Sequence, residues 1–342
     1  MEHQIDKSLV IDSLQKVLCT ATSTASDSRV ENNDYFKRRV LGFKAEIEFE
    51  NVVKKHSKDL KFVEGGQFIS KRISGTEADK NKFFYTTIDY ENPDAYLAVY
   101  KKISQWDEVE EMIYIQLLED DWSTESFKIT KKNGKKATST IIKPKFIFYS
   151  YVKETQTFEH HKIQDFSLIL RYFNQPERSP SLFKIRGDSQ FKYFEEYDLR
   201  TLKKIYATRY FLDNIMRQAQ ARQFIDLDGF IIKGDKIVLV EIKEKSPIKD
   251  DDNEVNWRYG WDSRRLLWYL YLLNKLSLPV LYNVRRINNR EERKFIEWDS
   301  LYIHDFLRGV GWSNSRSGGG GEDTLLAPYL YFKRIEEILT TL

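Results

Sequence analysis

Residues 224–245, with the sequence FIDLDGFIIKGDKIVLVEIKEK, constrain the fold of this 342-residue chain more than any other segment. Two apolar runs of strand type flank Gly234-Asp235, a pair that begins with glycine and suits a two-residue hairpin turn. Side chains in a strand alternate between its two faces, so Val238 and Val240 share a face that we expect to pack in the core. The segment therefore predicts a β-hairpin with a buried second strand.

Charged residues interrupt these two strands at positions that the turn brings together. A two-residue loop places Asp228 opposite Glu241 and Asp226 opposite Lys243. A four-residue loop keeps this register, whereas a three-residue loop shifts it by one residue and separates the acids. Directly opposed side chains have Cβ atoms about 5 Å apart, where like charges are destabilising. Two carboxylates at that separation can chelate one hard divalent cation, so the hairpin predicts a metal site.

A solvated hairpin face is the alternative. It would carry an Asp226–Lys243 ion pair and two exposed acids, which are common on protein surfaces. However, KIVLVEIK, residues 236–243, is typical of an interior strand, where an unpaired acid needs a compensating charge. The apolar run therefore favours the buried site over the exposed face.

Bulk composition limits the class of protein. The chain is long enough for two domains or one heavily embellished domain, and 41% hydrophobic with 31% charged residues is typical of a soluble globular protein. The single cysteine, Cys19, excludes a disulfide framework, an all-cysteine zinc site and a four-cysteine iron–sulfur cluster. There is no apolar run of membrane-spanning length and no signal-peptide pattern, so we expect a cytoplasmic protein. A net charge of +3 means that basic patches must be local.

The order of predicted elements indicates an α/β fold. Residues 34–55 have a capping aspartate and helical spacing, and residues 262–276 predict a second helix before a buried strand at 278–284. Short alternating runs between them suggest strands, and residues 127–142 form a hairpin candidate around Asn133-Gly134. Strand, strand, helix, strand in the C-terminal half predicts a sheet with helices packed on it.

The D…ExK pattern of the opening segment resembles the PD-(D/E)xK nuclease core, which restriction endonucleases share with archaeal Holliday-junction resolvases. Asp228, Glu241 and Lys243 take the three motif positions, and the segment is similar to the resolvase form. Leu227 stands where the family has proline, which leaves Asp226 as a rival for the aspartate position. The resemblance implies a restriction-endonuclease-like core, a central mixed β-sheet flanked by helices, with a large β-rich insertion.

Members of this superfamily often carry a glutamate on the first core helix, in a Gly-x-x-x-Glu arrangement that Gly42 and Glu46 match. Glu46 could equally be an ordinary surface glutamate on that helix. Its distance from Asp228 in the sequence leaves two organisations open: residues 61–197 are an insertion, or 198–222 is the core helix and 1–197 a separate domain. Only the first supplies a helix glutamate. We therefore favour an N-terminal segment with the first core helix, an insertion that is the candidate recognition region, and a catalytic core: residues 1–60, 61–197 and 198–342.

The resemblance also implies a mechanism. Asp228, Glu241 and the carbonyl of Ile242 would bind Mg²⁺, which acts as a Lewis acid and lowers the pKa of its bound water. Lys243 would orient or deprotonate the attacking water, and Glu46 would help to hold a second ion or its water. In the absence of metal, the Lys243 ammonium offsets the repulsion between the two carboxylates.

Local basic groups are candidates for contacts with nucleic acid. The hairpin sequence KKNGKK places four lysines around a turn, where they would either follow a phosphate backbone or keep the hairpin soluble: Lys131, Lys132, Lys135 and Lys136. Arg264 and Arg265 lie in the first turn of the predicted helix 262–276, where arginine opposes the helix dipole, so we expect them to contact phosphate. The aromatic and basic stretch NWRYGW, residues 256–261, is better explained by core packing than by stacking on bases.

These features predict a Mg²⁺-dependent DNA endonuclease, specifically a type II restriction endonuclease. The long insertion favours a reader of a specific duplex sequence over a structure-selective resolvase. Such enzymes usually act as homodimers on twofold-symmetric sites. The alternatives are a repair, recombination or ligand-activated defence nuclease of the same superfamily, and a binding protein on a degenerate nuclease scaffold. DNA is preferred to RNA by family frequency alone.

Overall fold

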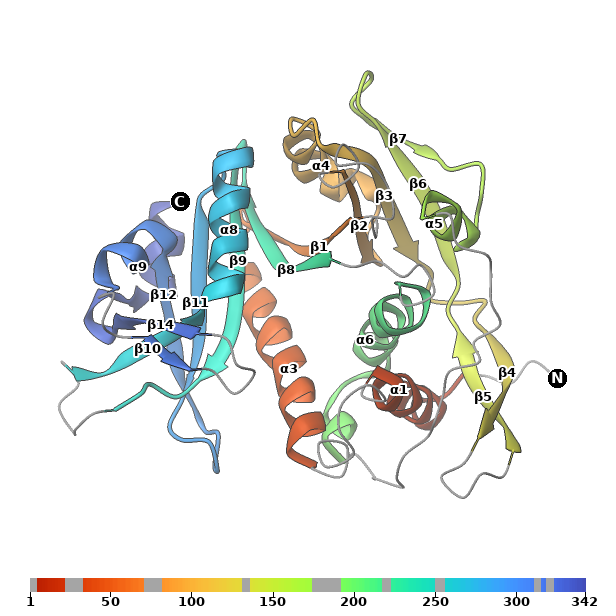
Figure 1. The fold of residues 1–342 in the computed structure, drawn as a ribbon, viewed down its shortest axis with the longest axis horizontal. Coiled ribbons are helices and arrows are strands. Elements are labelled where there is room, and N and C mark those ends of the chain that lie inside the picture. The colour runs from red at the N-terminus through yellow and green to blue at the C-terminus, as the bar shows by residue number, and fades with distance from the viewer. Residues whose placement is uncertain are drawn as a thin grey trace. The chain divides into compact units, whose positions relative to one another are not determined.

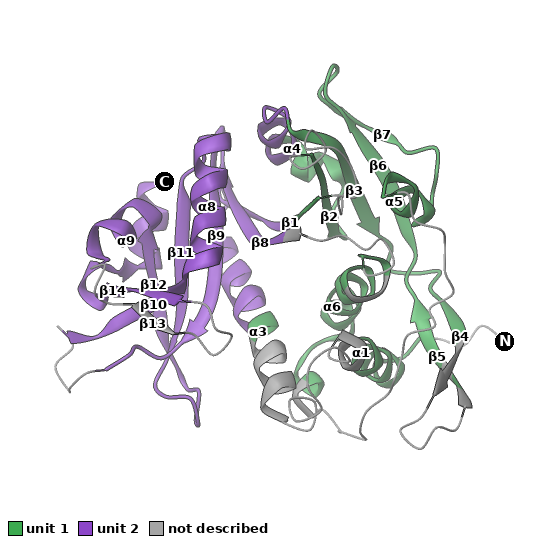
Figure 2. Ribbon diagram, in the orientation of Figure 1, with its two compact units in different colours: residues 1–43, 67–97, 108–224 green, residues 44–66, 98–107, 225–342 purple. Residues whose placement is uncertain are grey.

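The computed structural model describes residues 5–21, 33–70, 82–130, 136–173, 192–216, 223–249, 256–310, 315–317 and 323–342. The chain divides into two compact units (Figure 2). Unit 1 comprises residues 1–43, 67–97 and 108–224, and unit 2 comprises residues 44–66, 98–107 and 225–342. The chain therefore passes between the units more than once, and each unit is described by itself.

Unit 2 is built on a mixed sheet with the strand order β15-β12-β11-β9-β8-β1 (Figure 1). Strand β9 runs parallel to β11 and antiparallel to β8, and β11 is antiparallel to β12. The strands are β1 (Lys61–Ser70, of which residues 61–66 belong to this unit), β8 (Gln223–Lys233), β9 (Lys236–Lys245), β11 (Val280–Ile287), β12 (Phe295–Tyr302) and β15 (Lys333–Arg334). A smaller sheet has the order β10-β14-β13: β10 (Arg258–Asp262), β14 (Asp323–Pro328) and β13 (Ser315–Ser317).

The hairpin of β8 and β9 has the register that the sequence predicts. Lys233 pairs with Lys236, and the pairing continues residue by residue to Gly229 and Val240. Gly234 has a φ of 57°, a left-handed conformation that glycine adopts without strain, so the tight turn is possible. The register therefore leads directly to Asp228 and Glu241, the next residues outward.

Helices cover both faces of this sheet. On one face, Ala45, Phe49 and Val53 of helix α3 (Asn33–His56) and three residues of α10 (Ile335–Thr341) pack in one core cluster with Val238, Val240 and Ile242. Glu241 alternates with these valines, so it points to the opposite face, where α8 (Ser263–Leu276) lies. The helix expected at 34–55 is therefore present, and it packs on the sheet that bears Glu241. Helices α4 (Leu97–Ile103) and α9 (Ile303–Gly309) and the 3-10 turn η6 (Tyr329–Tyr331) complete the elements of this part of the chain.

Gly229 allows the site strand to pack closely on this core. A Cβ atom at Gly229 would lie 2.3 Å from the ring of Phe62 on β1. Phe62 in turn meets Phe49 of α3 edge-to-face, with ring centroids 5.8 Å apart. The residue after Asp228 must therefore be glycine for β1, β8 and α3 to pack in this way.

The sheet strands of unit 1 have the order β1-β2-β3-β6-β7, in which β2 and β3 are parallel. Its strands are residues 67–70 of β1, β2 (Phe83–Asp89), β3 (Val109–Leu117), β6 (Phe146–Val152) and β7 (Thr157–His160), with a separate hairpin of β4 (Ser123–Thr130) and β5 (Lys136–Lys143). Its helical elements are α1 (Lys7–Ala21), η2 (Pro93–Tyr96), α5 (Ser167–Tyr172), η3 (Lys192–Glu196), α6 (Leu199–Tyr210) and the π-helical turn η4 (Phe211–Ile215). The expected strand at 145–152 and the hairpin at 127–142 are present; its turn, residues 131–135, lies outside the described residues.

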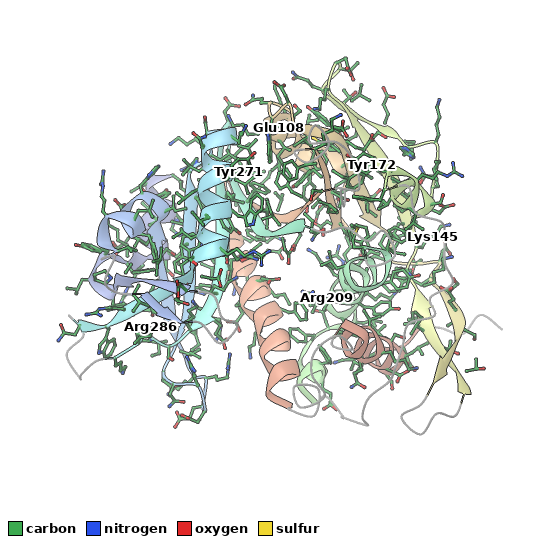
Figure 3. All side chains as sticks on the ribbon, in the orientation of Figure 1. Glu108, Lys145, Tyr172, Arg209, Tyr271 and Arg286 are labelled. Carbon is green, nitrogen blue, oxygen red and sulfur yellow. The ribbon has the colours of Figure 1, made fainter. Side chains whose placement is uncertain are left out.

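The predicted fold class, an α/β chain with a large mixed sheet flanked by helices, is confirmed. Side chains fill both units (Figure 3), and aromatic residues make up many of the largest fully buried ones. In the described part of the chain, no helix has the length and apolar character needed to cross a membrane.

Candidate functional site

The candidate site lies where β8 and β9 separate. Their ladder ends at Gly229 and Val240, and the backbone N–H of Ile242 donates to Oδ2 of Asp228 at 2.6 Å instead of to a strand carbonyl. On its other side β9 stays paired with β11 as far as Lys245. A side-chain oxygen therefore takes the place of a ladder bond, and it fixes the Asp228 carboxylate beside β9.

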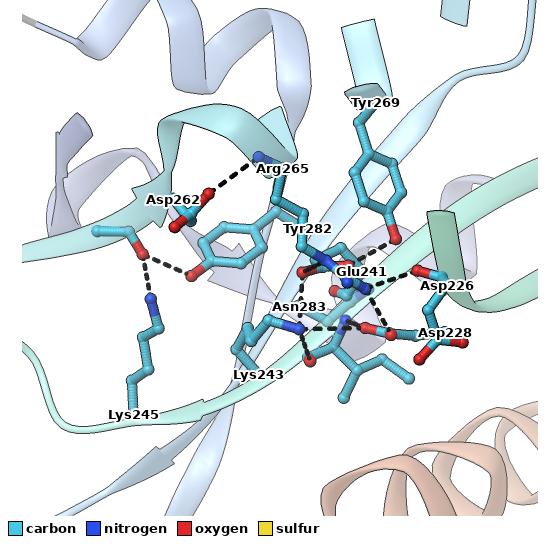
Figure 4. A network of polar contacts seen from close by, with 12 residues as sticks. Asp226, Asp228, Glu241, Lys243, Lys245, Asp262, Arg265, Tyr269, Tyr282 and Asn283 are labelled. Atoms are coloured by element: carbon cyan, nitrogen blue, oxygen red, sulfur yellow. Dashed lines mark hydrogen bonds and ion pairs between the residues drawn. The ribbon is translucent and has the colours of Figure 1, made fainter. Parts of the chain in front are cut away.

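The structure brings the predicted acids together and buries both. Glu241 is 0% exposed and Asp228 is 9% exposed. Their carboxylates share two cationic partners (Figure 4): Lys243 from the same strand and Arg265 from α8. Buried charges are tolerated only when they are paired and hydrogen-bonded, and this cluster meets both conditions.

The Lys243 ammonium marks the point where the predicted ligands converge. Its Nζ lies 2.7 Å from Oε1 of Glu241, 3.1 Å from the carbonyl oxygen of Ile242 and 3.5 Å from Oδ2 of Asp228. These three residues are the ones that the sequence predicts as metal ligands. Asp228 comes from β8, and Glu241 and Ile242 come from β9, yet oxygens of all three lie around the same Nζ atom.

Helix α8 supplies two further contacts that the sequence did not predict. Nε of Arg265 lies 2.6 Å from Oε1 of Glu241, and its Nη2 lies 2.9 Å from Oδ1 of Asp228 and 2.8 Å from the carbonyl oxygen of Asp226. Tyr269 donates its hydroxyl to Oε2 of Glu241 at 2.5 Å. Arg265 and Tyr269 are four residues apart, so one helix face presents both, and this spacing was the available sequence signal.

The start of α8 is fixed by a cap. The side chain of Asp262 accepts a hydrogen bond from the backbone N–H of Arg265 at 3.0 Å. Such a cap satisfies one of the free N–H groups in the first turn. The cap therefore holds the first turn of α8 where the Arg265 side chain reaches the two acids.

The two carboxylates have pKa values that diverge. Burial and the adjacent charge of Glu241 raise the pKa of Asp228 to about 7, and Lys243 and Arg265 offset only part of this effect. Burial also raises the pKa of Glu241, but Arg265 and Lys243 outweigh burial there and lower it to about 2. For Lys243, burial favours the neutral amine, yet Asp228 and Glu241 raise its pKa above the ordinary value. Divergence of this kind is typical of functional sites.

The donor set fits magnesium. Two carboxylates and a backbone carbonyl are hard oxygen ligands, and magnesium sites commonly use one or two carboxylates and complete their coordination with water and substrate phosphate. No group of three or more Asp, Glu, His or Cys side chains suited to a metal occurs among the described residues. A metal at this cluster would therefore depend on Asp228, Glu241 and the carbonyl oxygen of Ile242.

Two further acids were predicted for the site, Asp226 and Glu46. The Asp226 side chain is half-buried, its backbone carbonyl accepts from Arg265, and its charge adds to the raised pKa of Asp228. Lys243, which the register places opposite Asp226, contacts Glu241 and Asp228. Glu46 is half-buried on α3, and Glu48 of the same helix contacts a core strand: its Oε2 lies 2.6 Å from Nε of Arg285 on β11.

The predicted nucleic-acid contacts are only partly described. Lys131, Lys132 and Lys135 lie outside the described residues, and Lys136 begins β5 with a side chain that is not described. Arg264 is exposed on the first turn of α8, whereas Arg265 is directed at the acids. In the stretch 256–261, Trp261 is fully buried and stacks on Tyr282 with ring centroids 4.3 Å apart, so this tryptophan has the core role that was expected.

Another lysine, Lys245, lies two residues after Lys243 on β9. Lys245 of β9 donates to the carbonyl oxygen of Gly260, which also accepts from the Tyr282 hydroxyl at 2.8 Å. Burial lowers the pKa of Lys245 to about 8, and the nearby charge of Lys243 acts in the same direction. Alternation along β9 places Glu241, Lys243 and Lys245 on one face, so the site is bordered by a basic group that the sequence analysis did not single out.

The chain has a remote likeness to known structures. No protein-family model matches the sequence, and no curated protein matches it. Among solved structures, the chain is similar to a Holliday junction resolvase from the archaeal hyperthermophile Archaeoglobus fulgidus. The two are 8% identical with a TM-score of 0.22, over 33% of this chain and 73% of the resolvase chain. With a likeness this remote, the site residues themselves carry the functional assignment.

Proposed function

We propose that the chain is a metal-dependent nuclease that hydrolyses phosphodiester bonds of DNA. One observation carries the proposal: the buried Asp228 and Glu241 carboxylates and the Ile242 carbonyl surround a single cationic atom, Nζ of Lys243. Lys243 and Arg265 balance the charge of the two acids, but the acids are buried next to each other at the open end of a strand pair, where their charges repel. Such an arrangement costs stability and is typical of a site that binds a divalent ion.

The proposed roles follow from the contacts. Asp228, Glu241 and the Ile242 carbonyl would hold Mg²⁺, which when bound supplies Lewis acidity and an activated water. Lys243 remains protonated because both acids raise its pKa, so it can donate hydrogen bonds to a phosphate oxygen or to the attacking water. Tyr269 holds Oε2 of Glu241, which leaves Oε1 directed at the cations.

The substrate is proposed to be double-stranded DNA with a specific sequence, as for a type II restriction endonuclease acting as a homodimer. Unit 1 supports this assignment because it has its own sheet strands and its own core, which is more structure than phosphodiester hydrolysis alone requires. Within it, the sequence between β4 and β5 contains Lys131, Lys132 and Lys135, and Lys136 begins β5; these four lysines are proposed to contact the phosphate backbone. In unit 2, the exposed Arg264 is proposed to contact phosphate.

Plasmid cleavage tests this function. The protein is incubated with supercoiled plasmid and Mg²⁺, and the ends of the fragments are sequenced. We expect cleavage that stops on chelation and ends that share a flanking sequence. Loss of a residue that only supports a metal ligand typically reduces activity by about 10–100-fold. Glu241 is a proposed ligand itself, so Glu241→Gln should reduce cleavage by more than this.

Asp226→Asn is the matched control, because Asp226 is an acid two residues from Asp228 on the same strand but is more exposed and is not one of the proposed metal ligands. We expect this variant to retain cleavage. Full activity of Glu241→Gln would exclude the proposed metal site. Ends located at branches or termini would instead indicate a repair or recombination nuclease.

A further inference from the structure

We propose that Arg265 is a built-in competitor of the metal: its guanidinium occupies the inner oxygens of Asp228 and Glu241, and it must leave them when a divalent ion binds. The inference rests on the proposed function and adds a residue that sets the metal affinity of the site. The sequence analysis placed Arg265 only among candidate phosphate contacts.

The first argument is the identity of the oxygens. Arg265 takes Oε1 of Glu241 and Oδ1 of Asp228, at 2.6 and 2.9 Å. The other oxygen of each carboxylate is held by a different donor: Tyr269 on Oε2 of Glu241, and the N–H of Ile242 on Oδ2 of Asp228. Lys243 lies against Oδ2 of Asp228 and also contacts Oε1 of Glu241. The guanidinium thus bridges the two acids through Oε1 and Oδ1, and a metal ion that bridges the acids through the same pair of oxygens would displace it.

The second argument is charge. Asp228 and Glu241 carry two negative charges in their ionised forms, and Lys243 and Arg265 carry two positive charges, so the cluster is neutral without metal. A divalent ion added to this cluster would leave two uncompensated positive charges in a buried site, which is costly. If Arg265 leaves, the metal, Lys243, the two acids and one phosphodiester of the substrate together are neutral.

The third argument is that Arg265 can leave without disturbing the ligands. Its side chain is 27% exposed, whereas the side chains of Asp228 and Glu241 are 7% and 0% exposed. Arg265 lies in the first turn of α8, and an arginine side chain can swing out around its flexible stem. Tyr269 and the Ile242 N–H would hold the carboxylates in place after the guanidinium departs.

Metal binding without DNA tests the proposal. Mn²⁺ affinity is measured by titration calorimetry for the wild-type chain, for Arg265→Gln and for Arg264→Gln, a neighbour that is exposed on the same turn. We expect Arg265→Gln to bind Mn²⁺ at least about tenfold more tightly, a change of about 1.4 kcal/mol. Arg264→Gln should bind like the wild type.

The outcomes separate this proposal from the proposed function. If the wild type binds Mn²⁺ and Arg265→Gln binds it equally or more weakly, Arg265 supports the site instead of competing for it, and the inference fails while the nuclease function stands. If neither protein binds Mn²⁺, the metal site itself is wrong and both proposals fail.

A second measurement covers the case in which Arg265→Gln does not fold. In wild-type protein with ¹⁵N-labelled arginine, the Nε–H signal of Arg265 reports its hydrogen bond to Glu241. We expect Mg²⁺ to shift this signal strongly, because the bond to Oε1 is lost. A signal that stays in place at a saturating Mg²⁺ concentration would overturn the proposal.

Discussion

Each unit of the chain buries a cluster of acids and cations, and the two clusters differ in one respect. In unit 1, Asp89 is a single acid: its Oδ1 lies 2.9 Å from Nζ of Lys204, and its Oδ2 accepts from the hydroxyl of Tyr96 at 2.6 Å. In unit 2, Asp228 and Glu241 are two acids that share the same cations. Both clusters are hydrogen-bonded, but only the second places like charges next to each other.

The pKa values show what the second acid does. Burial raises the pKa of Asp89, but Lys204 and the hydrogen bond from Tyr96 outweigh burial, so the net pKa is lowered. At Asp228, burial and Glu241 act together and raise the pKa to about 7, despite two nearby cations. A buried acid with one cation stabilises its ionised form, whereas a second acid makes that form costly. Stability alone gives no reason to keep such a pair, whereas the proposed metal binding would.

Removing one carboxylate from each cluster should give the largest contrast. Asp89→Asn removes the buried carboxylate that lies 2.9 Å from the Lys204 ammonium, so we expect the free energy of unfolding to fall by about 3 kcal/mol. Asp228→Asn removes a like-charge contact with Glu241, so we expect the free energy of unfolding to rise by no more than about 1 kcal/mol. Urea unfolding in the presence of a chelator measures both.

Cleavage should show the reverse order: Asp228→Asn is inactive, and Asp89→Asn cleaves plasmid at a temperature where it is folded. If Asp228→Asn instead lost as much stability as Asp89→Asn, the unit 2 cluster would be a structural ion pair like that of unit 1. The two clusters would then not differ in kind, and the nuclease proposal would be wrong.

The stability contribution of Asp89 should depend on pH, and this effect is smaller than that of the substitutions. The lowered pKa of Asp89 means that the unfolded chain binds a proton more readily than the folded chain, so this group stabilises the fold above the unfolded pKa of about 3.9 and loses that contribution below it. The stability difference between the wild type and Asp89→Asn should therefore be full at pH 6 and shrink as the pH falls below about 3.9. Urea midpoints measured across this range would contradict the assignment if the difference stayed constant.

The local part of this structure could be predicted from the sequence. The register of β8 and β9 follows from a glycine turn and the strand period of two, and both are properties of neighbouring residues. That register predicted the meeting of Asp228 and Glu241. The helix α3 was predictable for the same reason, because helical spacing and a capping residue are local signals.

Contacts that depend on packing could not be predicted. Arg265 reaches the acids only because α8 lies across the face of the sheet that bears Glu241, and no local pattern specifies that placement. Arg285 and Glu48 form an ion pair across 237 positions of the sequence. The sequence of residues 107–121, with acidic and apolar residues, does not distinguish a helix from a strand, and residues 109–117 form β3.

The smallest test applies one substitution to both clusters. Tyr96 and Tyr269 each donate a hydroxyl to a buried carboxylate, at 2.6 and 2.5 Å, so replacing either with phenylalanine removes one hydrogen bond to a charged group and should cost about 1.5 kcal/mol of stability. The two variants should differ in metal binding. Without its Tyr269 partner, Glu241 is no longer held with Oε1 directed at the cations, so Tyr269→Phe should weaken Mn²⁺ binding about tenfold. Tyr96→Phe should leave it unchanged. Equal Mn²⁺ affinities in calorimetry for the two variants would mean that Tyr269, like Tyr96, serves only the stability of its unit.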